Sequence, residues 1–449
     1  MNDDHRLSAA LDQSATWMGQ LPSHWNRGRL KDIATSLAST VDKKSYDGQL
    51  AVRLCNYVDV YYNDRISSAL SFMEATASAE EIARFTVRAG DVAITKDSES
   101  ADDIGIAAFA DQDLPGVIYG YHLAILRTNP DSDGLFLKWL FDSTFVKSVL
   151  ATRSNGLTRV GLGQSALASL PLPIPPLAEQ RQIAEYLGRE TGQIDALITK
   201  QEQLAETLTE RRQAVITQAV TRGLDPALEL TESGIPWLGK VPTGWLLSRM
   251  KHLVADRESG TSVNAINTPA ESGEVGVLKT GSASRGIFDA SNNKVVLDED
   301  IARVTCPVRK SKIIINRANS PELVGSAALV REEHDNLFLS DKLWQLGFSS
   351  ESVFTYWWFQ TRTYKDQVSA LRVGTSSSMQ NLAYEDFKEI QISVPARSIQ
   401  KEIGIFLDLE TSRIDALIGK AREVVEVLKE RRQALISAAV MGKIDVRGL

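Results

Sequence analysis

The sequence predicts an α+β fold in which two similar mixed α/β domains are joined by two long helices packed as an antiparallel coiled coil. The first observation is an internal repeat: residues 210–214 and 430–434 both read Glu-Arg-Arg-Gln-Ala, an offset of 220 (430 − 210 = 220). The second is a long apolar seam in each copy, with spacings that alternate between four and three. The third is a series of short apolar runs between turn residues, which is typical of strands. Together they predict a pseudo-two-fold internal repeat.

The two seams predict the two long helices. The first seam runs from Ile183 to Val215 and the second from Ile403 to Leu435, and each is preceded by proline and followed by glycine. At ~1.5 Å per residue the first helix would extend for roughly 65 Å. That is too long for an ordinary core helix, although the alternative of two helices buried separately in their own domains remains. A seam of this length usually packs against another seam, and this chain contains one that matches it.

Four charged residues interrupt the apolar seams. A globular segment follows the first helix and must reverse the chain, so we expect the helices to pair in antiparallel fashion. Glu190 near the start of the first helix then lies close to Arg431 near the end of the second, and the repeat places Arg211 near Glu410. We expect these four residues to set the register of the helix pair.

The repeat also covers the segments that precede the helices. Trp17 and Trp25 recur as Trp237 and Trp245 (237 − 17 = 220), each pair enclosing a Gly/Pro turn. The predicted order is an N-terminal arm (1–16), a first domain (17–175), a first helix (176–224), a second domain (225–394) and a second helix (395–449).

Apolar runs predict the elements of each domain. In the first domain, strands are expected at 50–54, 92–95, 104–109 and 123–126, with one helix at 135–150 and a final strand at 170–175. In the second domain, strands are expected at 275–278, 312–316, 327–330 and 343–346, with one helix at 353–371 and a final strand at 390–395. The order of elements is shared but the residues between them mostly are not. Two different binding surfaces on one scaffold are therefore expected, and duplex DNA read at two half-sites would suit them.

Composition excludes several classes of protein. The net charge of −7 argues against binding nucleic acid by bulk electrostatics, so any such contact must come from local patches. The chain has no run of 18 apolar residues and its N-terminus lacks a signal-peptide pattern, so we expect a cytoplasmic protein that does not enter membranes. Two isolated cysteines and scattered histidines predict neither a disulfide framework nor a metal site.

Signatures of catalysis are missing as well. The sequence contains no P-loop, no strand-linked G-x-G-x-x-G, no H-E-x-x-H and no G-x-S-x-G motif. The Asp/Asn-Pro-Pro signatures of adenine methyltransferases are also absent. We therefore predict no catalytic residues and no enzyme activity of the chain alone.

The repeated segments resemble the specificity subunits of type I restriction-modification systems over nearly the whole chain. The marks of this resemblance are Ser-Gly-Ile-Pro-Trp-Leu-Gly-Lys-Val-Pro-Thr-Gly-Trp at 233–245, Pro-Pro-Leu-Ala-Glu-Gln-Arg at 175–181 and the two Glu-Arg-Arg-Gln-Ala blocks. The second helix departs from the pattern, because residues 395–400 have lost the second proline and the glutamate. We expect no functional loss from that change.

The resemblance implies a specific role. Each domain would be a target recognition domain that reads one half of a bipartite site in double-stranded DNA, and the paired helices would set the distance between the halves. Two modification subunits would bind the chain, carry S-adenosylmethionine and methylate adenine at N6. Translocating restriction subunits join in complete systems, and their presence here is left open. This chain would bind no cofactor itself.

Polar residues in loop-like stretches are the expected DNA contacts, because cations and amides hold phosphates and read base edges. They are Lys96, Arg153, Asn155, Thr158 and Arg159 in the first domain, and Lys279, Arg285, Arg317, Asn319, Arg372, Thr375 and Ser376 in the second. Two other hypotheses compete: a non-catalytic coiled-coil scaffold that binds protein partners, which the acidic net charge supports, and a divergent DNA enzyme that acts alone.

Overall fold

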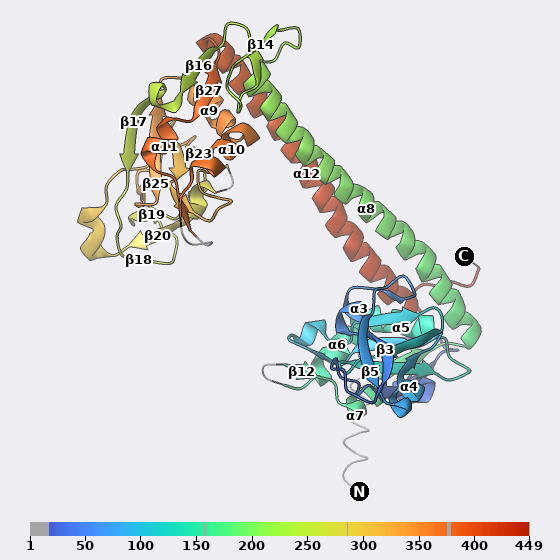
Figure 1. Ribbon diagram of the computed structural model, residues 1–449. Coiled ribbons are helices and arrows are strands. Elements are labelled where there is room, and N and C mark those ends of the chain that lie inside the picture. Colours follow the sequence, from blue (N-terminus) through green and yellow to red (C-terminus); the bar gives the residue numbers. More distant parts are fainter. Residues whose placement is uncertain (1–17, 157–158, 285, 375–378, 449) are drawn as a thin grey trace. The chain divides into compact units, whose positions relative to one another are not determined.

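The computed structural model describes residues 18–156, 159–284, 286–374 and 379–448. The chain divides into two compact units, one formed by residues 1–202 with 422–449 and the other by residues 203–421. Each unit holds one mixed α/β domain and parts of two long helices, α8 (Leu177–Arg222) and α12 (Arg397–Val440) (Figure 1). The arm predicted at 1–16 lies outside the described residues.

The domain of the first unit contains two larger sheets. The five-stranded sheet has the order β2 (Ala34–Ala38), β11 (Leu123–Thr128), β7 (Val92–Thr95), β9 (Ala107–Ala110) and β4 (Arg65–Ile66). The four-stranded sheet has the order β5 (Met73–Ala77), β3 (Leu50–Cys55), β10 (Leu114–Tyr119) and β6 (Thr86–Val87). Two-stranded pairs join β1 (Asn26–Arg29) to β13 (Pro171–Ile174), and β8 (Asp97–Ser98) to β12 (Val160–Gly161).

Short helices surround these sheets in the first unit. They are α2 (Leu30–Ile33), α3 (Tyr57–Tyr61), α4 (Ala79–Phe85), η1 (Ala101–Asp103), α5 (Gly134–Asp142), α6 (Thr144–Arg153) and α7 (Gln164–Ala168). One buried cluster includes Ile94, Phe136 and Leu187, so a strand, a short helix and the long helix α8 share one core. A second cluster lies between the sheets and includes Leu54 and Ile125.

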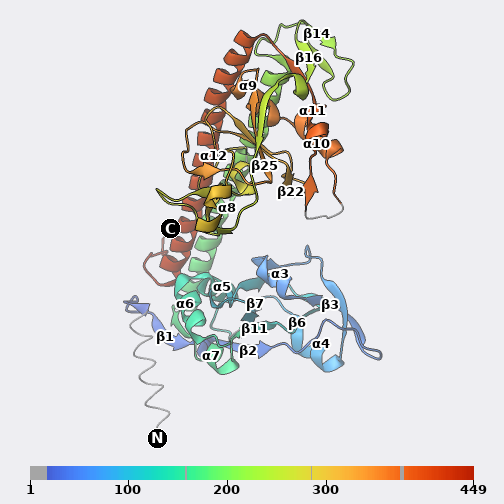
Figure 2. The same cartoon turned by 90° about the vertical axis from the view of Figure 1, so that its left-hand side faces the viewer.

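The domain of the second unit repeats the central part of this topology. The order β17 (Val254–Ser259), β25 (Leu343–Phe348), β21 (Ile313–Asn316), β23 (Ala327–Leu329) matches β2-β11-β7-β9, and all of these neighbours are antiparallel in both units. The other four-stranded sheet has the order β18 (Ala265–Ile266), β20 (Asn293–Val296), β19 (Gly276–Leu278) and β24 (Leu337–Phe338). Figures 1 and 2 show this domain beside the part of the helix pair that belongs to its own unit.

The remaining elements of the second unit are short. The two-stranded pairs are β14 (Leu230–Glu232) with β15 (Lys240–Pro242), β16 (Leu246–Arg249) with β27 (Gln391–Val394), and β22 (Ala318–Asn319) with β26 (Gln380–Asn381). The helices are η2 (Met250–His252), η3 (Thr280–Ala283), η4 (Asp298–Arg303), α9 (Ser352–Phe359), α10 (Arg362–Leu371) and α11 (Tyr384–Lys388).

The expectation of one helix at 135–150 and one at 353–371 was wrong, because each region contains two helices. Ser143 has an extended backbone between α5 and α6, and its hydroxyl accepts a hydrogen bond from the Val146 amide. Thr361 caps α10 in the same way through the Tyr364 amide. A Ser or Thr that caps the next helix ends the regular backbone even within an apolar run.

The antiparallel pairing of the long helices is confirmed within each unit. In the first unit, Ile183 near the start of α8 shares a buried cluster with Val440 at the end of α12. In the second unit, Val220 near the end of α8 shares a cluster with Ile403 near the start of α12. The seam is not uniformly buried, since the predicted seam residue Leu197 is 48% exposed.

Ion pairs link the two helices one position away from the predicted residues. Arg212 lies 2.8 Å from Asp415 in the second unit, and its repeat equivalent Arg432 lies 2.9 Å from Asp195 in the first. By comparison, Arg211 lies 4.0 Å from Glu410. The ion pair of Glu190 is with Arg189 on the same helix, and within the described residues Arg431 forms no ion pair. We therefore move the registry hypothesis to Arg212 and Arg432.

Charge reversal tests this register. Asp415→Arg places two cations together and should destabilise the second unit by about 0.5–1 kcal/mol, since the pair is partly exposed. Adding Arg212→Asp should restore most of the loss, as measured by urea unfolding. As a control, Glu410→Arg, alone or together with Arg211→Glu, should change the free energy of unfolding little, because this pair is 4.0 Å apart. A double variant no more stable than Asp415→Arg alone would contradict the hypothesis.

Candidate nucleic-acid interface

The two units build the same backbone frame at the end of a central strand. Lys96 follows β7 and Arg317 follows β21, and each carbonyl accepts a 2.8 Å hydrogen bond from a leucine amide, Leu162 or Leu382. The Lys96 amide also donates to the His122 carbonyl at 3.1 Å, and the Arg317 amide donates to the Lys342 carbonyl at 3.0 Å. The repeat therefore places a cation at the same point of both domains.

In the first unit, that frame carries what we term the Lys96 cluster: Lys96, Asp97, Tyr121, His122 and Arg159. The Asp97 carboxylate forms an ion pair with Arg159, with 2.6 Å between Oδ1 and Nη2, and its other oxygen lies 2.9 Å from His122 Nδ1. The Lys96 ammonium lies 4.6 Å from the centre of the Tyr121 ring. Arg159 is 52% exposed in this arrangement. One carboxylate thus orients an exposed guanidinium and an imidazole beside a second cation.

Burial weakens the hydration of Lys96. Its Nζ donates to the Ser39 carbonyl at 3.4 Å, and burial lowers the pKa of Lys96 while the nearby Asp97 raises it. A cation with an incomplete water shell loses less hydration when it meets a phosphate or a base edge. The cluster is therefore suited to contacting nucleic acid.

Tyrosines border the Lys96 cluster. Tyr57 stacks on Tyr61 at 5.4 Å and meets His122 edge-on at 6.5 Å, and Tyr62 is 77% exposed. The Tyr61 hydroxyl donates to Asp103 at 2.6 Å, which raises the pKa of Tyr61 to about 12. Exposed aromatic faces beside cations can stack on bases or contact sugars. Sequence reasoning missed these residues, although three tyrosines at 57–62 were a visible signal.

The other residues predicted in the first domain have different surroundings. Arg153 ends α6, where its guanidinium donates to the Ala166 carbonyl and the Ser169 hydroxyl, both at 3.2 Å. Burial lowers the pKa of Arg153, with nearby Arg29 as a further cause. Asn155 is exposed and forms a bridge with Gly161 in the segment that contains Arg159. Thr158 lies outside the described residues.

In the second unit, lysines line what we term the Lys342 cleft. It has a volume of about 540 Å³, and its cations are Lys279, Lys294 and Lys342, with Asp341 as its one acidic lining residue among those described. Hydroxyl groups also line it, from Thr261, Ser262, Thr280 and Ser340. The backbone hydrogen bond from Arg317 to the Lys342 carbonyl connects this cleft to the shared frame. Of the three lysines in the cleft, sequence reasoning predicted Lys279 and missed Lys294 and Lys342.

The remaining candidates of the second domain are held by neighbours. Asn319 lies on β22 and donates to the Ser284 hydroxyl at 3.4 Å. Arg372 caps α10 and donates to the Pro321 carbonyl. Arg285, Thr375 and Ser376 lie outside the described residues. The structure thus brings Lys96 and Arg159 to the same carboxylate, and it joins Arg317 by its backbone to Lys342, which lines the cleft with Lys279. By contrast, Arg153 and Arg372 have their guanidinium groups engaged inside the domains.

Among the described residues, no group of three or more His, Cys, Asp and Glu side chains could hold a metal ion. In the same part of the chain, no helix is both long and apolar enough to cross a membrane.

A duplicated scaffold with a different polar face on each copy defines a two-site recognition protein. Comparison with known proteins identifies its family. A family model described as "Type I restriction modification DNA specificity domain" matches residues 22–206 and 254–426. Because the match covers more than half of the chain, the chain belongs to this family. The resemblance seen in the sequence is therefore confirmed.

Named relatives agree with this assignment. The chain is 23% identical to the putative type I restriction enzyme MjaX specificity subunit of Methanocaldococcus jannaschii, covering 96% of each chain. It is also 23% identical to the EcoKI specificity subunit of Escherichia coli K12, over 80% of this chain and 75% of the relative.

Solved structures support the fold. A chain from the study "Structural basis underlying complex assembly and conformational transition of the type I R-M system" matches with a TM-score of 0.71 at 17% identity, over 95% of this chain and 100% of that chain. The HsdS subunit of Thermoanaerobacter tengcongensis matches with a TM-score of 0.54 at 18% identity, over 95% of this chain and 98% of that one. The predicted fold class, with two repeated mixed domains and long helices, is confirmed.

Proposed function

We propose that this chain is the sequence-reading subunit of a type I restriction-modification complex, in which each domain reads one half of a bipartite DNA site. The observation that carries the proposal is the shared frame at Lys96 and Arg317, surrounded by different side chains in the two units. Equal placement with unequal chemistry suits two unequal half-sites.

The two faces would contact DNA in different ways. In the first domain, Arg159 is oriented by Asp97, as a guanidinium must be to donate two hydrogen bonds to one guanine edge. The neighbouring tyrosines would contact bases or sugars. In the second domain, the three lysines of the Lys342 cleft would hold phosphates and position the duplex. Local cations thereby offset the acidic net charge of −7.

The chemistry itself would belong to partner subunits. Two modification subunits would dock on the helix pair, bind S-adenosylmethionine and methylate adenine at N6 after rotating the base out of the duplex. Restriction subunits would join where the system also cleaves DNA. This chain would bind no cofactor and catalyse no step, and it would act in the cytoplasm, where its DNA is.

Substitutions in one domain should change only one half-site. Arg159→Gln should relax the sequence requirement in the first half by roughly tenfold or more, because a bidentate base contact contributes about 1–3 kcal/mol. The second half should stay unchanged. Mapping of N6-methyladenine in cells that contain the modification subunits measures both halves at once.

Lys342→Gln provides the matched control in the other domain. It should weaken methylation at all sites and leave the first half-site sequence intact, since a phosphate contact carries little sequence information. A change in both halves from Arg159→Gln would contradict the assignment of one half to each domain.

The acidic net charge favours one alternative, a coiled-coil scaffold that binds only protein partners. The two hypotheses differ in DNA binding by the assembled complex. A complex that forms with its partners but binds no duplex DNA would support the scaffold.

A further inference from the structure

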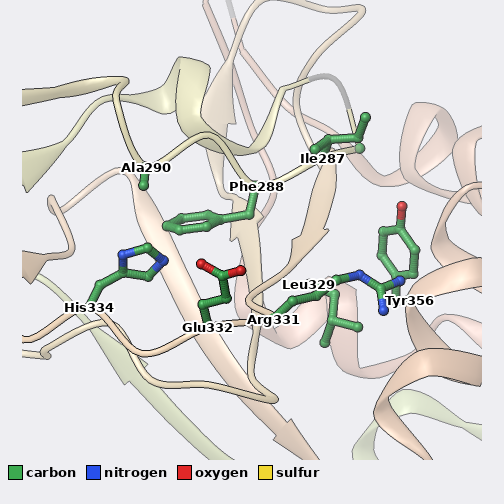
Figure 3. A pocket seen from close by; sticks show the side chains of 9 residues that line it. Ile287, Phe288, Ala290, Leu329, Arg331, Glu332, His334 and Tyr356 are labelled. Carbon is green, nitrogen blue, oxygen red and sulfur yellow. The ribbon is translucent and has the colours of Figure 1, made fainter.

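A pocket in the second unit has a chemistry different from that of the Lys342 cleft. It has a volume of about 280 Å³ and lies beside β23 (Figure 3). Its walls are Gly286, Ile287, Phe288, Ala290, Leu329, Arg331, Glu332, His334 and Tyr356. Figure 3 shows Glu332 between His334 and Arg331, with its carboxylate directed toward the ring of Phe288.

Aromatic side chains form two walls of this pocket. The rings of Phe288 and His334 lie 5.2 Å apart, and on the opposite side the Arg331 guanidinium lies over the ring of the buried Tyr356, 5.8 Å from its centre. The face of a ring such as that of Phe288 attracts cations through the negative potential over it. A flat, delocalised cation would gain most, because it can stack as well as donate hydrogen bonds.

Among the described residues that line the pocket, Arg331 is the one with a fixed positive charge, and that charge is already neutralised. Arg331 forms two hydrogen bonds of 2.8 Å with the Asp408 carboxylate, which raise the pKa of Arg331. Asp408 also accepts from the Trp357 indole at 2.9 Å. The charge that remains in the lining is negative and belongs to Glu332, which is exposed. Phosphate groups would be repelled there, whereas a cation would be attracted.

The duplication shows what occupies the equivalent place in the first unit. Arg65 pairs with Phe109 across β4 and β9, just as Ile287 pairs with Leu329 in the second unit. The Arg65 guanidinium lies over the Phe109 ring, 5.2 Å from its centre. The first domain thus covers this position with its own guanidinium. The second domain has Ile287 there, 67% exposed, beside an open pocket.

We propose that this pocket binds an arginine side chain from a basic segment of a partner polypeptide. The guanidinium would pair with the Glu332 carboxylate and stack on Phe288, while Tyr356, with Arg331 over its ring, closes the far side. The pocket shares no lining residue with the Lys342 cleft, and its Glu332 carboxylate favours a protein segment over nucleic acid. Only the second domain would make this contact with a partner, because in the first domain the Arg65 guanidinium already occupies the equivalent position.

Titration of the full chain with a small probe tests the pocket directly. N-acetyl-L-arginine N-methylamide should bind, as measured by saturation-transfer NMR, and the neutral citrulline analogue should not. Glu332→Gln should weaken binding by about tenfold, since it removes a hydrogen bond to a charged group. Ile287→Arg should abolish binding by placing a guanidinium where the first domain has Arg65.

Glu333→Gln is the matched control, because it removes the same charge from the same turn but lies outside the pocket lining. It should change the affinity little. Equal binding of the citrulline analogue, or equal losses from Glu332→Gln and Glu333→Gln, would overturn the proposal.

Crosslinking in the purified complex with its modification subunits tests the nature of the occupant. A photoreactive benzoylphenylalanine in place of Ile287 should capture a partner peptide that contains arginine. Capture of a DNA strand, capture of a peptide without arginine, or the lack of any crosslink in an intact complex would each contradict the polypeptide assignment.

Discussion

Lys138→Met should destabilise α5 and its surroundings by about 3 kcal/mol, because it breaks a buried ion pair from one side. The Lys138 side chain is 2% exposed, and its ammonium lies 2.7 Å from both Asp142 and Asp64. Asp64 is largely exposed and also pairs with Arg432 at 3.2 Å, so it keeps a counter-ion. Asp142 would be left as an unpaired buried carboxylate.

Hydrogen exchange localises this effect. Peptides from 134–142 should lose protection by about a hundredfold, which corresponds to the ~3 kcal/mol loss. Peptides from 352–359, the equivalent helix of the second unit, should be unaffected. The double variant Lys138→Met with Asp142→Leu should recover most of the loss, because it leaves no unpaired charge. Equal protection in the single and double variants would contradict the account.

The penalty should also depend on pH. Burial already raises the pKa of Asp142, although Lys138 opposes that shift. Without Lys138, the Asp142 carboxyl binds a proton more tightly in the folded state than in the unfolded state. Protonation at lower pH therefore stabilises the folded variant. The loss caused by Lys138→Met should therefore be largest near neutral pH and shrink as the pH approaches the raised pKa of Asp142.

Lengthening both helices by one heptad should widen the gap between the two half-sites by about three base pairs. Seven added residues extend a helix by roughly 10 Å, and base pairs are spaced by ~3.4 Å. In an antiparallel pair, the numbers of facing residues have a constant sum, and for both Asp195–Arg432 and Arg212–Asp415 that sum is 627. Segments 199–205 of α8 and 422–428 of α12 therefore face each other, so duplicating both keeps the pairing. The half-site sequences should not change.

Inserting the heptad in only one helix is the control. It displaces one of the two ion pairs by seven residues and should prevent assembly with partners. An unchanged gap in the N6-methyladenine motif after the matched insertion would contradict the role of the helices in setting the distance.

The long helices were predictable because their seams follow from local spacing and from the repeat. The ends of these seams are buried, as at Ile183 and Leu187, but the exposure of Leu197 could not be read from spacing alone. The helix breaks at Ser143 and Thr361 were also hidden, since a capping hydroxyl looks like any polar residue within an apolar run.

The candidate interface was predictable only in part. Lys96 and Arg317 lie in the shared frame, but Asp97 on β8 meets Arg159 through the pairing of β8 with β12, and Tyr121 and His122 lie in the turn before β11. Cross-strand neighbours follow from the register of the sheet, which sequence spacing does not determine. Arg153 and Arg372 illustrate the opposite error, because long cations in loop-like sequence can be engaged inside the fold.

Methylome mapping tests the central claim most directly. Cells that express this chain with its modification subunits would be compared with cells that lack only this chain. We predict N6-methyladenine at one bipartite, asymmetric motif that disappears when the chain is removed. Unchanged methylation, despite a stably assembled complex, would contradict the claim that this chain selects the DNA sequence.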